Sequence, residues 1–205
     1  MMLAHRLARQ LAHPKGLPGR LLGNAIDVVN RKPTRLAVDL LAPCPGEAVI
    51  DAGCGTGAAM AELLARADCR VTGADASATM LEAARQRLGP RASYLEAKLE
   101  DISLPDAAFD AVLALNVLYF ESKDHAMLRR MRGLLKTGGR LVAYVTDRQS
   151  MENWSFAREG FHRLFDKETL CAALADAGFA QARIEVHEVA ITRSVTGLLA
   201  RAWRS

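Results

Sequence analysis

The sequence contains no hydrophobic run long enough to cross a membrane. Its apolar stretches are interrupted well short of the roughly 18 to 20 residues that a transmembrane helix needs. The basic residues that follow Met1 lead into neither the apolar core nor the cleavage site of a secretory signal peptide. These absences argue against a transmembrane helix and favour a cytoplasmic protein.

Cysteine is scarce, and its spacing fits no structural site. The chain has four cysteines, at positions 44, 54, 69 and 171, and no two of them form a CxxC pair. That pattern excludes a disulfide scaffold and a cysteine metal clip, so we expect no metal and interpret these residues as small and buried. Internal repeats and low-complexity segments are also lacking. A length of 205 residues favours one domain with small additions.

Positive charge is concentrated at the start of the chain. Residues 1–35 contain seven basic residues and one acidic residue, so they carry +6 while the remainder carries −2 of the net charge of +4. Residues 3–12 place leucine at every fourth position, which predicts a short amphipathic helix. We therefore divide the chain into a basic helical arm, residues 1–34, and a domain, residues 35–205. Three roles stay open for residues 1–35: contact with an anionic membrane, cover over an anionic substrate, or a solvated lid.

Beyond the arm, the pattern predicts an α/β domain. Strands and helices alternate, which indicates a parallel sheet with helices on both faces and a ligand site at the carboxyl ends of the strands. Two closely joined strands at the end of the chain should be antiparallel. The expected helices are 21–30, 34–41, 58–66, 77–88, 124–135 (ended by Gly138-Gly139) and 167–177; the expected strands are 49–51, 69–74, 92–95, 109–115, 140–145, 182–189 and 197–203; residues 148–164 are expected to form a loop or lid.

The most informative stretch is VIDAGCGTG, Val49 to Gly57. An apolar run ends in Asp51 and is followed by glycines at 53, 55 and 57. This predicts a buried strand, a tight turn that lets a ligand approach the backbone, and a helix whose free amide groups face that ligand. A dinucleotide fingerprint has its third glycine one residue later. Asp51 would repel a phosphate and attract a ligand that carries cationic groups.

A second acid, Asp75, ends the second predicted strand in the sequence GADAS. A carboxylate at that place can accept hydrogen bonds from both hydroxyls of a ribose. The alternative is local, because either Asp75 or Ser77 could cap the helix that follows. The position of Asp75 relative to the glycines favours the role of binding a ribose.

Together these motifs resemble those of the class I S-adenosylmethionine-dependent methyltransferases, in the subgroup that methylates small molecules, quinones and lipids. The resemblance rests on VIDAGCGTG, GADAS followed by Met80-Leu81, LEDISLPDAAFDAVLALNVLYF and LLKTGGRLV, and it covers about residues 35–205. It implies a Rossmann-like, seven-stranded sheet of order 3-2-1-4-5-7-6 with the last strand antiparallel. The implied cofactor is S-adenosyl-L-methionine, with S-adenosyl-L-homocysteine as the product.

The resemblance also implies roles for individual residues. Asp51 and the turn would lie along the methionine part of the cofactor, Asp75 would hold the ribose, and residues 76 and 80 would flank the adenine. Leu115 and Asn116 would face the sulfonium and the acceptor. The implied cofactor-binding residues are Asp51, Gly53, Cys54, Gly55, Gly57, Asp75, Ala76, Met80, Leu99, Glu100, Leu115 and Asn116.

One position departs from the family pattern. Lys98 stands where relatives usually carry an acid for the adenine amino group, and lysine can only donate a hydrogen bond. Either Glu100 or Asp101 takes over, or the backbone and stacking hold the adenine alone. Both acids could equally be solvated loop charges.

No catalytic constellation is evident, which agrees with methyl transfer from an activated sulfonium, where alignment and desolvation supply most of the catalysis. A general base is needed only for some acceptors. The candidates are Tyr119 and His162, while His125 is expected on the surface. The aromatic residues of 154–161 form either an apolar wall of the acceptor pocket or a small core.

The acceptor stays open between several classes. We expect a small or amphiphilic molecule, with a phospholipid headgroup amine at the membrane surface as an alternative. A nucleic acid is disfavoured because the domain is slightly acidic and Asn116 to Tyr119 do not form the NPPY motif of nucleic-acid methyltransferases. A cofactor-binding protein without catalysis is a further alternative.

Overall fold

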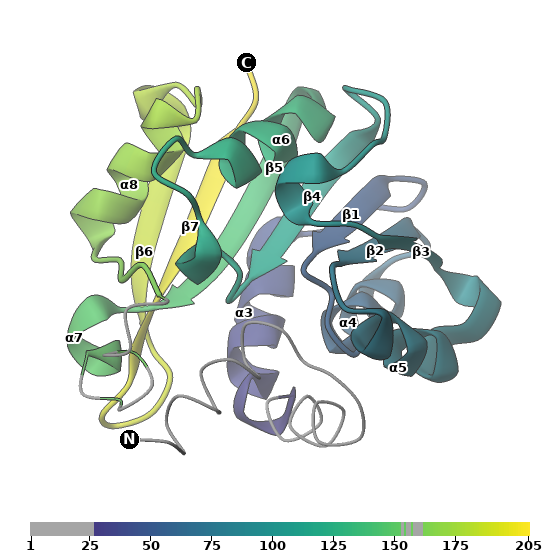
Figure 1. The fold of residues 1–205 in the computed structure, drawn as a ribbon, viewed down its shortest axis with the longest axis horizontal. Coiled ribbons are helices and arrows are strands. Elements are labelled where there is room, and N and C mark those ends of the chain that lie inside the picture. Colours follow the sequence, from purple (N-terminus) through teal and green to yellow (C-terminus); the bar gives the residue numbers. More distant parts are fainter. Residues whose placement is uncertain (1–26, 153, 155–156, 158–161) are drawn as a thin grey trace.

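The computed structural model describes residues 27–152, 154, 157 and 162–205 (Figure 1). Seven strands form one sheet in the order β3-β2-β1-β4-β5-β7-β6. Neighbouring strands are parallel except at β7, which runs antiparallel to both β5 and β6. The predicted topology is therefore confirmed. The strands are β1 Ala48–Ala52, β2 Arg70–Asp75, β3 Ser93–Glu96, β4 Phe109–Leu115, β5 Leu135–Thr146, β6 Ile184–Ala190 and β7 Thr196–Trp203.

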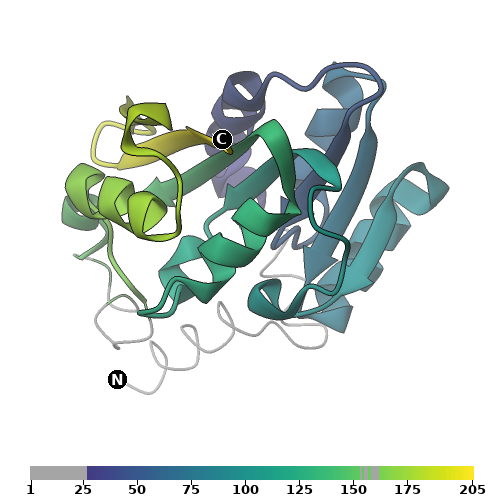
Figure 2. The ribbon, with the colours of Figure 1, turned by 90° about the horizontal axis from the view of Figure 1, so that it is seen from above.

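Helices cover both faces of the sheet (Figure 2). On one face, α3 packs over β4, β5 and β7, while α4 and α5 pack over β2; on the other, α6 packs over β4 and β5, and α8 over β6 and β7. The helices are α3 Arg31–Leu41, α4 Ala58–Arg66, α5 Ala78–Leu88, α6 Ala126–Leu134, α7 Arg148–Met151 and α8 Lys167–Asp176, with short 3₁₀ turns η1 Gly89–Arg91, η2 Leu99–Asp101, η3 Leu118–Phe120 and η5 Gln181–Arg183.

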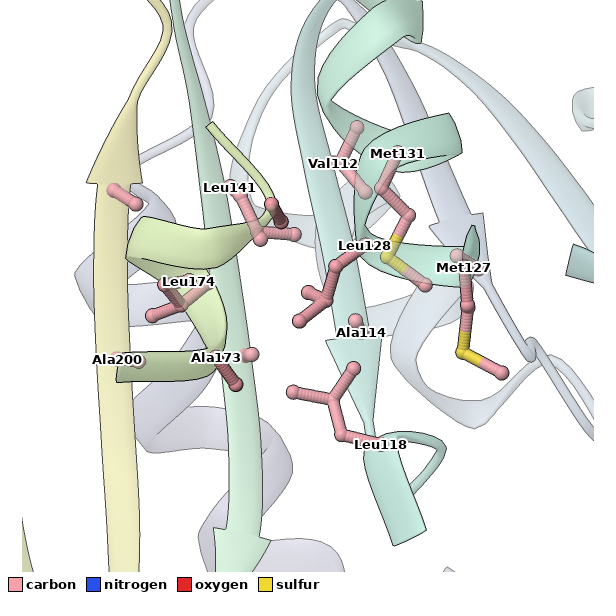
Figure 3. Packing of buried hydrophobic residues seen from close by; sticks show 14 of the residues in the cluster. Val112, Ala114, Leu118, Met127, Leu128, Met131, Leu141, Ala173, Leu174 and Ala200 are labelled. Carbon is pink, nitrogen blue, oxygen red and sulfur yellow. The ribbon is translucent and has the colours of Figure 1, made fainter. Parts of the chain in front are cut away.

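Strand β4 shows why the sheet lies at the centre. Successive residues of a strand point to opposite faces. Val112 and Ala114 accordingly join the core beneath α6 and α8, while Ala111 and Leu113 join the core beneath α3 and α4. In Figure 3, Leu128 and Met131 of α6 pack over β4 in the first of these cores. A strand buried on both faces has to be apolar throughout, as FDAVLAL nearly is.

The prediction for Gly138-Gly139 is wrong. Helix α6 already ends at Leu134, and the two glycines lie within β5, where its register against β4 shifts between Phe109–Leu135 and Ala111–Arg140. A side chain at position 139 would come within 2.8 Å of the Lys136 carbonyl oxygen. The glycine pair therefore makes room for a bulge in a strand.

The arm and the lid fall largely outside the described residues. The expected helix 3–12 and most of the expected helix 21–30 lie there, although residues 27–29 are helical. In the expected lid, α7 precedes Trp154, which packs against the core, while Phe156 and Phe161 are outside the described residues. Among the described helices, none has the length and hydrophobicity to span a bilayer.

Candidate active site

The candidate site lies at the carboxyl ends of β1, β2 and β4, where the glycine turn follows β1. The backbone amides of Gly53 and Cys54 both donate to the carbonyl oxygen of Ala74, at 2.8 and 3.0 Å, and tie the turn to β2. Gly53, Gly55 and Gly57 all have positive φ, at 81°, 51° and 79°. The turn therefore needs glycine at each of these positions.

The surroundings of two of these glycines differ. A Cβ at Gly53 would lie 2.1 Å from the Val117 side chain, so the turn and the segment after β4 are in close contact. A Cβ at Gly55 would meet nothing within 4 Å, so this part of the backbone borders open space. That open side is where a ligand could approach the turn.

Asp51 is the second-to-last residue of β1 and is almost completely buried, at 1% exposure. Its Oδ2 has no hydrogen-bond partner among the described residues. Burial, with the charge of Asp75 as a smaller contribution, raises its pKa to about 7. A buried carboxylate oxygen without a partner fits a ligand that brings a cationic or hydrogen-bond-donating group.

Asp75 lies at the end of β2 with both carboxylate oxygens directed at backbone amides. Its Oδ2 accepts from Gly55 N–H at 2.9 Å and its Oδ1 from Ser77 N–H at 2.8 Å. Burial is the main cause of its raised pKa. Ser77, and not Asp75, caps α5 by accepting from Met80 N–H. Each carboxylate oxygen has a further lone pair, so Asp75 can still accept hydrogen bonds from a ribose.

The residues expected around the adenine are split between surface and core. Ala76 and Glu100 are exposed, whereas Met80 and Leu99 are buried. Leu99 lies close to the glycine turn, because its Cδ1 is 3.8 Å from the position that a Cβ of Gly53 would take. Glu100 lines a cavity of about 260 Å³ together with Phe120.

The end of β4 is joined to the end of β5 through Tyr119. Its buried hydroxyl accepts from the Thr146 backbone amide at 2.5 Å and donates to Asn116 Oδ1 at 3.1 Å. Asn116 has a φ of 57° and donates its own amide to the Tyr144 carbonyl. Burial raises the pKa of Tyr119 well above its usual range. Leu115 is half-buried beside the core beneath α3 and α4.

The structure brings the two candidate catalytic residues together. The rings of Tyr119 and His162 lie edge to face with centroids 6.1 Å apart, and the His162 ring is 5.3 Å from that of Phe120. Burial lowers the pKa of His162, which favours the neutral imidazole at pH 7. A neutral imidazole can accept a proton.

His125 is buried, so the prediction of a surface position is wrong. It has a φ of 56° just before α6, its Nδ1 is 3.4 Å from Arg163 Nη1, and its Nε2 is 3.8 Å from Asp176. A helix start next to two partners from distant segments cannot be recognised from local sequence.

Sequence reasoning missed one cluster at the glycine turn. Asp27 Oδ2 accepts from the Thr56 hydroxyl at 2.6 Å and from Arg87 Nη2 at 2.7 Å, and Arg87 Nη1 also reaches Thr56 Oγ1. One signal was present, since Asp27 is the single acid of residues 1–35. Its partners are 29 and 60 positions away, so only the fold reveals them.

The fold and the site define a class of protein. A seven-stranded sheet of this order, with a glycine turn after β1 and an acid at the end of β2, is the architecture expected for class I methyltransferases. Likeness to solved structures agrees: the S-adenosyl-L-methionine complex of Haemonchus contortus phosphoethanolamine N-methyltransferase 2 has a TM-score of 0.71 at 16% identity, over 84% of this chain and 52% of the other.

Sequence comparisons match part of the chain to methyltransferases. Residues 49–139 match the model described as a methyltransferase domain. The chain is 41% identical over 118 residues to trans-aconitate 2-methyltransferase of Methylobacterium radiotolerans, and 35% identical over 121 residues to ubiquinone biosynthesis O-methyltransferase of Methylocella silvestris. These matches cover 56% and 58% of this chain; the chain spans about half the length of these curated relatives, 45% and 46%. Residues 49–139 of this chain are therefore similar to a methyltransferase domain, and the fold of the chain is that of a methyltransferase structure.

Proposed function

We propose that the chain binds S-adenosyl-L-methionine and catalyses methyl transfer to a small or amphiphilic acceptor. The observation that carries this proposal is Asp51, a buried carboxylate with a free oxygen beside a glycine turn that borders open space. Such a site suits a ligand with both cationic groups and a need for close backbone contact. The family match over residues 49–139 supports the same ligand.

The cofactor supplies a methyl group activated on a sulfonium. In this proposal Asp51 and the backbone of Gly53 to Gly57 bind its methionine part, and Asp75 accepts from the ribose hydroxyls while it holds the turn. Leu99 and Glu100 on η2, with Ala76 and Met80 at α5, border the adenine. The role of each residue here is to bind and orient, which is the main requirement of an in-line displacement.

At the end of β4, Leu115 and Asn116 face the reacting groups. Because the Tyr119 hydroxyl already accepts from Thr146 N–H and donates to Asn116, we assign it to orienting the Asn116 amide. His162, held neutral by burial, is then the candidate base for an acceptor that has to lose a proton.

Isothermal titration calorimetry with S-adenosylhomocysteine tests the binding step. Wild-type protein should bind it and Asp51→Asn should bind it more weakly, whereas NAD should not bind. A labelled methyl transfer screen against extracted metabolites and lipids then tests turnover. Binding of NAD without binding of S-adenosylhomocysteine would overturn the proposal in favour of an oxidoreductase.

A membrane-surface acceptor is the second candidate, and one observation favours it. Val28 and Val29 are 75% and 74% exposed, and the basic residues Arg31 and Lys32 follow them after Asn30. Apolar side chains beside cationic ones are typical of segments that bind anionic bilayers. Pelleting with phosphatidylserine vesicles should retain wild-type protein and retain less of Val28→Ser/Val29→Ser; equal, negligible pelleting of both would exclude this candidate.

A further inference from the structure

A cluster of three side chains from distant segments holds the glycine turn at a residue next to the one that Asp75 binds. Asp27, Thr56 and Arg87, which we call the Asp27 latch, form a closed set of hydrogen bonds of 2.6 to 3.2 Å. Asp27 precedes α3, Thr56 lies in the turn before α4, and Arg87 lies in the last turn of α5. The latch therefore joins three helical segments at one residue of the turn.

Thr56 is well placed to control the conformation of the turn. It stands between Gly55 and Gly57, both of which have positive φ, and its side chain is almost buried, at 3% exposure. The neighbouring residue of the turn is held by the bond from Gly55 N–H to Asp75 Oδ2. Glycine-rich backbone has many alternative conformations, so a turn with several glycines needs such ties to stay in one of them.

We propose that the Asp27 latch preorganises the glycine turn for the cofactor, with Asp27, Thr56 and Arg87 as positioning residues. This inference rests on the proposed function, because it concerns the same ligand. When the latch is intact, the turn is ordered during folding and the ligand binds a ready surface. When the latch is broken, part of the ordering cost falls on binding, and affinity decreases.

Thr56 offers a matched pair of variants. Thr56→Val keeps the shape and the β-branched side chain but removes the hydroxyl, whereas Thr56→Ser keeps the hydroxyl. By calorimetry, Thr56→Val should raise the Kd for S-adenosylhomocysteine about tenfold, because it removes the hydrogen bonds of the hydroxyl to Asp27 and from Arg87 and part of that loss falls on binding, and Thr56→Ser should stay near wild type. Arg87→Met should raise the Kd as Thr56→Val does. It takes the place of Thr56→Val if that variant does not fold.

The control is another ion pair of the same helical region. Asp39 of α3 pairs with Arg66 of α4, away from the glycine turn. Asp39→Asn should leave the Kd unchanged. Equal Kd values for wild type, Thr56→Val and Arg87→Met, or an equal rise in Asp39→Asn, would overturn the proposal.

Amide hydrogen exchange of the unliganded protein separates the latch from the proposed function. Exchange at Gly55 should be faster in Thr56→Val than in wild type or Thr56→Ser, because the turn opens more often. Wild-type protein that fails to bind S-adenosylhomocysteine would refute the proposed function, whereas unchanged Gly55 exchange in Thr56→Val would refute the latch whatever the ligand.

Discussion

At the scale of single residues, Asp51 is the clearest sign that the site is built for a ligand. A protein that needed only to fold would gain from a neutral side chain here, because a buried carboxylate with a free oxygen destabilises the folded state. The raised pKa expresses this cost. The effect of this raised pKa on the stability of the folded protein can be tested without a ligand.

We expect Asp51 to make the unliganded protein less stable as the pH rises toward 7. Between its ordinary pKa of 3.8 and its folded pKa of about 7, the folded state holds a proton that the unfolded state has released. The free energy of unfolding therefore falls across this window, with a slope that approaches about 1.4 kcal/mol per pH unit, and levels off above it. Asp51→Asn should remove this slope.

Urea denaturation at pH 5, 6, 7 and 8 measures the effect as the difference between wild type and Asp51→Asn. Asp110→Asn serves as the control, because hydrogen bonds from Lys136 and the Ala48 amide outweigh burial and lower the pKa of Asp110, so this carboxyl is ionised throughout that range. If the free energy of unfolding falls with pH in Asp51→Asn as steeply as in wild type, the assignment of this pH dependence to Asp51 is contradicted.

The buried hydroxyl of Tyr119 should contribute to the stability of the folded protein. Tyr119→Phe leaves the buried amide of Thr146 without its acceptor, which should cost about 1–3 kcal/mol in the free energy of unfolding. Tyr94→Phe is the matched control, since the Tyr94 hydroxyl donates to the Gly89 carbonyl in a partly exposed place that water can reach. It should cost less than Tyr119→Phe in urea denaturation, and the reverse order would contradict the role of Tyr119 in joining β4 to β5.

At the scale of elements, α6 is fixed at both ends by side chains from outside the helix. The Glu121 carboxylate accepts from the amides of Met127 and Leu128, at 3.2 and 2.8 Å, in the first turn. At the other end, Arg204 donates to the carbonyls of Arg132, Gly133 and Leu135. These bonds satisfy backbone amides and carbonyls at the ends of the helix, which have no partner within the helix itself.

Glu121→Ala should therefore destabilise the protein by about 1–3 kcal/mol, because two buried amides lose their acceptor. Glu121→Gln keeps one acceptor oxygen and should lose less stability than Glu121→Ala. Asp124→Ala, at an exposed position before the same helix, should have a small effect in the same thermal or urea denaturation. Equal losses of stability in Glu121→Ala and Asp124→Ala would show that stability depends on negative charge near the start of the helix and not on the hydrogen bonds of the buried carboxylate.

The elements that sequence reasoning found are those whose pattern is local. Helix 58–66 and strand 109–115 have the predicted bounds, because an amphipathic repeat and a continuous apolar run each occupy one segment. The prediction that Gly138-Gly139 ends a helix was wrong because it depends on contacts that are not local. A glycine pair after a helix ordinarily ends it, and only the pairing of β4 with β5 shows that these glycines make a bulge.

The same division holds for the site at the scale of the whole molecule. The turn, Asp51 and Asp75 were found because a strand, a turn and an acid lie in fixed order along the chain. The Asp27 latch and the link from Tyr119 to Asn116 were not, since both depend on helices and strand ends that meet only in the folded sheet. The residues proposed to bind the donor can be predicted from local sequence, whereas the contacts that order them in the folded sheet cannot.

Binding should also change the stability of the whole molecule. A ligand that binds only the folded state stabilises it by about 2.7 kcal/mol at one hundred times its Kd. For a chain of this size that corresponds to a rise of about 5–11 °C in Tm. S-adenosylhomocysteine should thus raise the Tm of wild-type protein in a concentration-dependent way. NAD at the same concentrations should leave it unchanged.

The size of this shift should depend on pH through Asp51. If the ligand pairs with the ionised carboxylate, binding at pH 6 has to displace a proton that is already absent at pH 8. The rise in Tm at a fixed concentration of S-adenosylhomocysteine should therefore be larger at pH 8 than at pH 6 for wild type, and similar at both for Asp51→Asn. A wild-type shift that is independent of pH, or larger at pH 6, would mean that the ligand binds without engaging the Asp51 carboxylate.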